Sequence, residues 1–218
     1  AGLTSNERFA LDAYRRFIGM FGRIVMDVKA ERFDEPLEAR KHAHGADAKD
    51  TDLTVEDLKA LVVEFKQVVR EDTGREFPTD VYEQLDLAVK AVFASWFGKR
   101  ANDYRNSQKI AHDLGTAVNV VTMVFGNMGG DSGTGVAFTR NTFDGTKELY
   151  GEYLVNAQGE DVVAGIRTPL PLRREVEAAA GAEPDSSLEA KMPDVFQKLV
   201  DVRNRLEKHF RDMQHIEF

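Results

Sequence analysis

The feature that most constrains this chain is a glycine-dense loop at residues 126–135, in which five of ten positions are glycine. Runs rich in Val, Thr and Phe flank it at residues 118–125 and 136–140, and such runs favour β-strands. Without Cβ atoms a loop of this kind can approach a ligand closely, and its N–H groups can cradle an anion such as a phosphate. The alternative interpretation is a long mobile hairpin without a ligand.

The loop does not match the common phosphate-binding motifs. No Gly-Lys-Ser/Thr follows it, so it is not a Walker A loop, and Phe138 stands where the dinucleotide fingerprint needs a third glycine after Gly133 and Gly135. The loop also leads into a predicted strand, so no helix N-terminus supports an anion there. The remaining phosphate-binding option is a flap over a nucleotide, carried by an antiparallel hairpin.

Composition excludes several classes of protein. The net charge of −8 argues against a nucleic-acid surface or an anionic membrane as partner, and no apolar run is long enough to span a bilayer. The chain has no cysteine, which excludes disulfides and thiolate chemistry and is compatible with the cytoplasmic location that we expect. It begins without methionine and ends on a strand-like Ile-Glu-Phe, so we interpret it as a piece of a longer protein.

The first 98 residues predict helices. An apolar stripe predicts one helix from Asn6 to Val28, and residues 33–49 predict a shorter, weaker one. The capping box Thr54–Asp57 starts another helix, which Gly74 ends and whose apolar stripe is Leu58, Leu61, Val62, Phe65, Val68 and Val69. A further helix opens at Pro78-Thr79-Asp80 and closes at Gly98, with an apolar stripe of Tyr82, Leu85, Val89, Val92, Phe93 and Trp96. We expect these stripes to pack together into a core, and the alternative is a partner surface.

Two smaller patterns in this part suggest chemistry but favour structure. The pair His42 and His44 has no third ligand nearby, so a solvated loop is favoured over a metal site. Basic residues at 99–100 and Arg105 surround Tyr104, and we expect a structural role for them rather than base stacking.

The second half predicts strands and a final helix. Asp144-Gly145 marks a hairpin turn before a strand at 149–155, and residues 156–165 are either a polar wall beside a nucleotide or a surface turn. Residues 172–191 predict a mobile surface excursion with one helical turn. A helix begins at Pro193, with a predicted buried face of Val195, Leu199, Val202, Leu206, Phe210 and Met213.

Several long runs resemble the N-terminal, ATP-binding region of pyruvate phosphate dikinase, and phosphoenolpyruvate synthase is similar only in outline. The resemblance spans nearly the whole chain, and the runs that carry it are residues 14–18, 91–96, 115–120, 123–127, 131–141, 150–169 and 206–214. The resemblance implies an α+β fold with a helical subdomain at 6–91 and a partial ATP-grasp-like antiparallel β region at 92–218.

The resemblance also implies a nucleotide site. Adenine is expected against Met123, Val124 and Phe125, which are otherwise core strand residues, and phosphates under Gly133, Thr134 and Gly135. Arg140 and Arg167 are candidates for phosphate contacts or structural ion pairs. Glu217 matches a metal- or nucleotide-contacting glutamate, whereas His215 stands where the family usually has an aspartate, and imidazole is a poor Mg²⁺ ligand.

The resemblance implies that the parent protein makes phosphoenolpyruvate from pyruvate, ATP and orthophosphate through a phosphohistidine on another domain of the same chain. A homo-oligomeric parent is expected. The alternatives are a phosphoenolpyruvate synthase fragment and a non-catalytic interaction or regulatory module. We expect residues 1–218 alone to be inactive and to bind MgATP poorly, because the resemblance places other ATP-contacting side chains outside this sequence.

Overall fold

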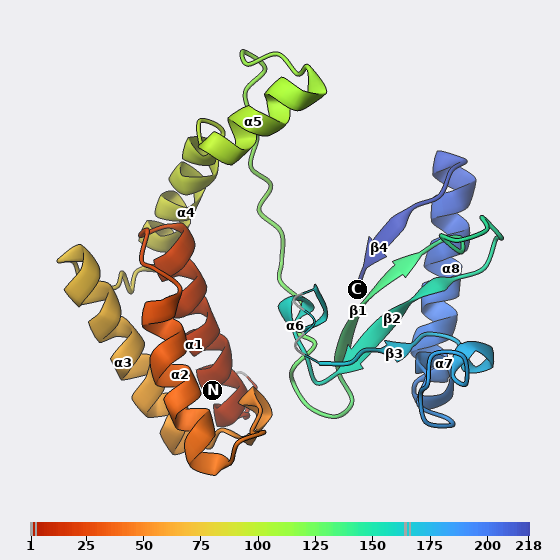
Figure 1. The fold of residues 1–218 in the computed structure, drawn as a ribbon, viewed down its shortest axis with the longest axis horizontal. Coiled ribbons are helices and arrows are strands. Elements are labelled where there is room, and N and C mark those ends of the chain that lie inside the picture. Colours follow the sequence, from red (N-terminus) through yellow and green to blue (C-terminus); the bar gives the residue numbers. More distant parts are fainter. Residues whose placement is uncertain (1, 3, 164, 166) are drawn as a thin grey trace. The chain divides into compact units, whose positions relative to one another are not determined.

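The computed structural model describes residues 2, 4–163, 165 and 167–218, and the chain forms two compact units, residues 1–121 and 122–218. The first unit is helical and the second is built on an antiparallel sheet, so the predicted α+β class is confirmed (Figure 1). The division falls after Val121, whereas the sequence placed the boundary at residue 91, inside helix α4 (Val81–Ser95). Ala164 and Ile166, which belong to a run carrying the resemblance, lie outside the described residues.

Three helices form the core of the first unit: α1 (Glu7–Ile24), α2 (Glu31–His44) and α3 (Val55–Thr73). The side chain of Asn6 caps α1 by accepting the N–H of Phe9 at 3.0 Å. The predicted capping box of α3 is confirmed, since the Thr54 hydroxyl accepts the N–H of Asp57 while the Asp57 carboxylate accepts the N–H of Thr54. Gly74 ends α3 at φ 67°, as expected for a left-handed helix stop.

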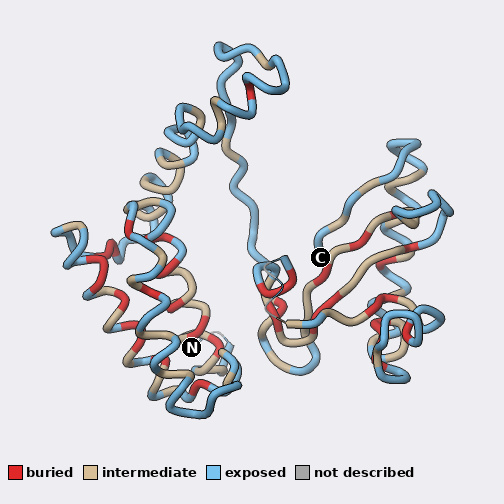
Figure 2. The backbone as a smooth tube through the Cα atoms, viewed as in Figure 1, coloured by how far each residue is buried: buried red, intermediate tan, exposed pale blue. Residues whose placement is uncertain are grey.

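Aromatic side chains fill the space between these helices, and Figure 2 shows the buried residues along their facing sides. The ring centroids of Phe33 and Phe65 lie 5.0 Å apart. Close packing depends on a glycine in α1, because a Cβ on Gly22 would lie 2.6 Å from the Phe33 ring. The predicted apolar stripe of α3 is fully confirmed as core.

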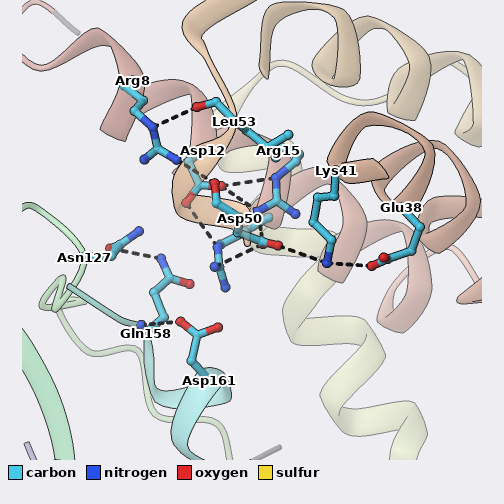
Figure 3. A network of polar contacts seen from close by, with 11 residues as sticks. Arg8, Asp12, Arg15, Glu38, Lys41, Asp50, Leu53, Asn127, Gln158 and Asp161 are labelled. Atoms are coloured by element: carbon cyan, nitrogen blue, oxygen red, sulfur yellow. Dashed lines mark hydrogen bonds and ion pairs between the residues drawn. The ribbon is translucent and has the colours of Figure 1, made fainter. Parts of the chain in front are cut away.

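A buried ion network ties the short 3₁₀ helix η1 (Asp50–Asp52) to α1 (Figure 3). Arg15 contacts Asp12 at 2.5 Å and Asp50 at 2.9 Å, and Arg16 contacts both of these carboxylates. Burial alone would raise the pKa of Asp50, but Arg15, Arg16 and Lys41 outweigh it and lower that pKa. Charge in this network and the buried side chain of Leu53 together hold the connection between α2 and α3.

Helix α4 corrects one prediction. It begins at the expected place, with Asp80 accepting the N–H groups of Tyr82 and Glu83 at 2.9 Å. None of its residues is buried, however, and Tyr82 is 78% exposed and Phe93 47% exposed (Figure 2). Only its opposite side, through Leu87 and Ala88, packs partly on the core. The periodicity gave the helix correctly, but the predicted stripe is not core.

Helix α5 (Lys99–Gln108) is held by one arginine. The Arg105 guanidinium lies 3.9 Å from the centroid of the Trp96 ring and donates to His112 Nδ1 and to Asn102 Oδ1. Arg105 is buried, so the predicted structural role is confirmed for this residue.

The expected strand at 118–125 is absent, although all of these residues are described. They are extended but unassigned, and Val121 and Val124 are 80% and 89% exposed. A strand needs the backbone of a neighbour to complete its hydrogen bonds, and no other segment of the described chain pairs with this one. Residues 118–125 thus have the composition of a strand but no neighbouring strand among the described residues.

The sheet of the second unit has the order β3-β2-β1-β4 and is antiparallel throughout. Its strands are β1 (Gly133–Phe138), β2 (Tyr150–Val155), β3 (Leu170–Pro171) and β4 (His215–Glu217). The β1–β2 hairpin and its turn are confirmed: Gly145 has φ 76°, and its N–H donates to the carbonyl of Asn141 at 2.9 Å. Short helix α6 (Gly159–Val163) follows β2, so part of the segment predicted as a polar wall or a surface turn is helical.

Helix α8 (Pro193–Phe210) packs on one face of this sheet, against Ala137 and Tyr153 (Figure 1). Its start at Pro193 is confirmed, but its predicted buried face is wrong apart from Leu199. Phe196, Leu199 and Val200 contact the sheet core, whereas Val195, Val202, Phe210 and Met213 are 42–55% exposed. The side of the helix facing the sheet is set by the sheet's own position, which periodicity does not show.

Residues 172–191 are anchored rather than a surface excursion. They contain the 3₁₀ helix η2 (Arg174–Val176) and the short helix α7 (Leu188–Lys191), and Leu172 and Leu188 are each 1% exposed in the sheet core. The buried carboxylate of Glu177 accepts the N–H groups of Asp185 and Ser187 at 2.9 Å. Apolar residues at both ends of the segment thus fix it to the sheet.

Candidate functional site

The second face of the sheet, opposite α8, holds the side chains that chemistry would use. Strand alternation and the observed register place nine residues on it: Thr134, Val136, Phe138, Tyr150, Glu152, Leu154, Pro171, His215 and Glu217. Leu154 and Val136 pack with Val162 of α6, which covers one end of this face. The remainder combines aromatic rings with two carboxylates.

Two cross-strand rows order this face. Val136 of β1 pairs with Glu217 on one side and Glu152 on the other, so the two carboxylates flank one apolar residue. In the next row Phe138 pairs with His215 and Tyr150, and the rings of Phe138 and His215 stack at 4.8 Å and 13°. The structure therefore brings the predicted residues His215 and Glu217 onto one face, and both are exposed.

The predicted phosphate residues Gly133, Thr134 and Gly135 lie in strand β1, not in a loop. The N–H of Gly135 donates to the Phe218 carbonyl at 2.9 Å, and the Thr134 hydroxyl donates to the same oxygen at 2.8 Å. A Cβ on Gly135 would lie 2.6 Å from the Phe218 ring. In this chain these residues hold the C-terminal segment.

The true loop is residues 126–132, and its own side chains organise it. The Ser132 hydroxyl accepts the N–H groups of Met128 and Gly129 at 2.9 Å and donates to the Gly129 carbonyl. Gly126 is buried between two backbone carbonyls, since a Cβ there would lie 2.4 Å from the Ala157 oxygen and 2.5 Å from the Gly133 oxygen. Glycine at 126 is thus explained by close backbone approach.

The start of α6 lies against this loop through polar contacts (Figure 3). The Gln158 side chain donates to Asn127 Oδ1 at 3.4 Å, and the N–H of Gln158 donates to Asp161 Oδ2 at 2.8 Å. Asp161 is buried. These contacts connect the loop to α6, the helix that covers one end of the second face.

Both candidate phosphate-binding arginines are engaged in structural contacts. Arg140 forms a bidentate pair with Glu207, with both distances 2.8 Å, and Arg167 donates to the carbonyls of Asn156 and Val155 at 3.0 Å. Arg140, followed by the Thr139 hydroxyl, lowers the pKa of Glu207 to about 2. Of the two roles considered for Arg140, the ion pair is the one present in this structure.

The candidate adenine residues are not arranged as a strand. Met123 is 57% exposed and Val124 89% exposed, and Phe125 is half-buried. Gly126, directly after them, is held by the N–H of Ala157 donating to its carbonyl at 2.9 Å. This bond joins the C-terminal end of the segment to the sheet unit.

No metal site is complete within the part of the chain that the structure describes, where no group of three His, Cys, Asp or Glu residues is arranged to hold an ion. Glu217 offers one carboxylate, and His215 beside it offers an imidazole that Mg²⁺ disfavours. His42 and His44 lie in the last turn of α2 and not in the predicted loop, and His44 contacts Asp57 Oδ2 at 2.8 Å. The described residues alone do not fit Mg²⁺.

The sequence did not predict the polar cluster at the start of β4, which Thr139, Glu207 and Gln214 form. Thr139 is fully buried, and its hydroxyl connects Glu207 to the backbone of Gln214. The only signal was a threonine before an arginine at the end of a predicted strand, and a glutamate on a predicted helix. Their partnership spans 68 residues and depends on how the helix lies on the sheet.

The chain thus combines a glycine-dense connection, an antiparallel sheet with carboxylates on one face and a packed helix in an α+β fold. Residues 34–192 match the family described as the pyruvate phosphate dikinase, AMP/ATP-binding domain. The chain belongs to this family.

Whole-chain relatives agree with that membership. The chain is 52% identical over 216 residues to pyruvate, phosphate dikinase of Clostridium symbiosum, covering 99% of this chain and 23% of that protein. It is 52% identical over 220 residues to the chloroplastic enzyme of Flaveria pringlei, and 51% identical over 214 residues to the chloroplastic enzyme 1 of Arabidopsis thaliana. These cover 100% and 98% of this chain, but only 22% and 21% of the relatives. The chain thus spans under a quarter of their length.

Within the described residues no helix is long and apolar enough to cross a membrane.

Proposed function

We propose that this chain contributes the nucleotide-binding part of a longer phosphotransferase, which makes phosphoenolpyruvate from pyruvate, ATP and orthophosphate through a phosphohistidine. One observation carries the proposal: half of the residues are identical to enzymes named pyruvate, phosphate dikinase over essentially all of this chain. Mg²⁺, orthophosphate, a phosphohistidine domain in the same parent chain, a homo-oligomeric parent and a cytoplasmic location are parts of this proposal.

The second face of the sheet is the part of this chain that we assign to the nucleotide. Glu217 is the carboxylate that would face the phosphates, and Met123, Val124 and Phe125 would lie against adenine. Gly133, Thr134 and Gly135 border the same face, and phosphate contact through them requires release of Phe218, which now occupies the Gly135 N–H. Arg140 would act by holding Glu207 rather than by contacting phosphate.

The decisive experiment uses the full-length parent protein with ATP, orthophosphate and pyruvate, followed by ³¹P NMR. We expect AMP, pyrophosphate and phosphoenolpyruvate, and we expect turnover to stop when orthophosphate is removed. Formation of phosphoenolpyruvate without any orthophosphate requirement would show the alternative, a phosphoenolpyruvate synthase, which uses water instead. If the full-length protein neither consumes nucleotide nor binds MgATP, the remaining alternative is the non-catalytic interaction or regulatory module.

Residues 1–218 alone should bind MgATP more weakly than micromolar. Arg140, Arg167 and the Gly135 N–H are already bonded within the chain, and hydrogen bonds to charged groups are each worth about 1.5–3 kcal/mol. A micromolar Kd needs about 8 kcal/mol of binding. Isothermal titration of MgATP into this chain tests the statement, and a micromolar Kd would contradict it.

A further inference from the structure

The position of Glu217 depends on a very short strand. Strand β4 has three residues and pairs only with β1. Because side chains alternate along a strand, a slip of one residue would turn His215 and Glu217 from the second face towards α8. A ladder of three residues specifies its register weakly, so other contacts must fix it.

Such contacts lie where β4 begins. The Thr139 hydroxyl accepts the N–H of Gln214 at 2.8 Å and donates to Glu207 Oε1 at 2.8 Å, while the N–H of Thr139 donates to the Gln214 carbonyl at 2.9 Å. Thr139 is 0% exposed. The hydroxyl and the backbone N–H of the buried Thr139 thus both hold Gln214, the residue directly before β4.

Glu207 fixes this arrangement to the last turn of α8. Its carboxylate takes Arg140 in a bidentate pair, and its backbone carbonyl accepts the N–H of Arg211, which ends the helix at φ 60°. Arg203, one turn earlier, donates to the Thr139 carbonyl at 3.0 Å. The end of α8, the end of β1 and the start of β4 therefore meet at one polar cluster.

The far end of β4 has separate contacts. Gly135 and Phe218 exchange backbone hydrogen bonds of 2.9 and 3.0 Å, and the Phe218 ring lies over Gly135. Because the contacts at the two ends of β4 are separate, the Phe218 end can report what the polar cluster does. If the cluster only attaches the helix to the sheet, losing it leaves the Phe218 end unchanged.

We propose that Thr139 and Glu207 are positioning residues that set the register of β4 and so hold Glu217 on the second face. The functional part of this inference rests on the proposed function, in which Glu217 faces the nucleotide. The structural part does not, because it concerns the pairing of β4 with β1 alone.

Amide exchange measured by NMR on residues 1–218 tests the structural part. Thr139→Val removes the hydroxyl at nearly constant volume, and Thr146→Val is the matched control, since the Thr146 hydroxyl bonds only Asp144 in an exposed turn. We expect Thr139→Val to lower the protection of the Phe218 amide as well as the Gln214 amide by about tenfold, with Thr146→Val unchanged. Loss confined to Gln214 would overturn the proposal.

Glu207→Gln provides a second test should Thr139→Val unfold the sheet. This substitution keeps the shape of the side chain and removes its charge. The core amides of Tyr153 and Leu199 serve as the control that reports whether the fold persists. We expect those to stay protected while Phe218 loses protection. Unchanged Phe218 protection in this variant would also overturn the proposal.

The functional part is tested with Glu207→Gln in the full-length parent. We expect the MgATP concentration for half-maximal rate to rise about tenfold, equivalent to about 1.4 kcal/mol, with kcat within about twofold. A fall in kcat with unchanged half-saturation would contradict positioning. If the wild-type parent has no dikinase activity, the proposed function fails, whereas the amide-exchange result on β4 still decides the register.

Discussion

Helices α3 and α4 lie in the same unit and have similar apolar stripes, yet they differ in what covers them. The six stripe residues of α3 are all buried, whereas no residue of α4 is buried. The α3 stripe meets the aromatic residues of α1 and α2, while most of the α4 stripe is exposed and its last member, Trp96, contacts Arg105 of α5 instead of the core. Periodicity therefore predicts that a helix forms, and tertiary context decides whether its apolar side is a core.

The largest expected effect contrasts two phenylalanines. Phe65→Ala in α3 should cost about 3–5 kcal/mol, because it leaves a cavity against Phe33. Phe93→Ala in α4 should change stability by less than about 0.5 kcal/mol, because the side chain is 47% exposed. Urea unfolding of residues 1–218 followed by circular dichroism measures both. Equal losses would show that the α4 stripe is covered in solution.

The next contrast concerns charge. Asp12→Asn should destabilise the helical unit by about 3 kcal/mol, because it leaves Arg15 buried with a weakened partner. Asp103→Asn breaks an exposed pair with Lys99 on α5 and should cost no more than about 0.5 kcal/mol. Paired denaturation curves at neutral pH give the difference. An Asp12→Asn loss as small as that of Asp103→Asn would show that the network contributes no stability.

A third contrast separates two glycines of one loop. Gly126→Ala should destabilise the sheet unit by about 1–3 kcal/mol, since its Cβ would clash with two backbone carbonyls that cannot move aside cheaply. Gly130→Ala meets no atom within 4 Å and should be close to neutral. Thermal unfolding of both variants checks this. A neutral Gly126→Ala would mean that the loop repacks without cost.

These pairs show which parts of the structure the sequence could predict. The starts of α1, α3 and α4 follow from local signals: Asn6, Thr54 and Asp80 each cap a helix with their own side chain. The β1–β2 hairpin likewise follows from Asp144-Gly145. Both partners of such a local hydrogen bond lie within a few residues of each other, so the sequence alone predicts it.

Features that depend on distant partners were mispredicted. Residues 118–125 have strand composition but no neighbour to pair with, and the exposed side of α8 was taken for its core. The sequence predicts a loop at Gly133 and Gly135, because glycine spacing does not reveal that both lie in strand β1, where Gly135 meets the Phe218 ring. For the candidate site, the resemblance pointed to Glu217 and to the departure at His215, but the sequence gave no sign of the Thr139–Glu207 contact near them.

The smallest expected effect tests the local side of the comparison, at the cap of α3. Thr54→Ala should cost about 1 kcal/mol, as capping residues do, and without any change in the core. The cap also gives a pH signature. Hydrogen bonds from the Thr54 hydroxyl and N–H, followed by His44, lower the pKa of Asp57 from 3.8 to about 2.

Because the folded pKa of Asp57 is the lower one, its stabilisation is present above about pH 4 and is lost as the pH falls towards 2. In Thr54→Ala the carboxylate keeps the backbone N–H and His44 but loses the hydroxyl, so stability should depend less steeply on pH in that window. Urea midpoints between pH 2 and 5 for the wild type and Thr54→Ala test this. Parallel curves would show that the Thr54 hydroxyl does not hold the carboxylate, and that the cap acts through the Thr54 oxygen and the N–H of Asp57 alone.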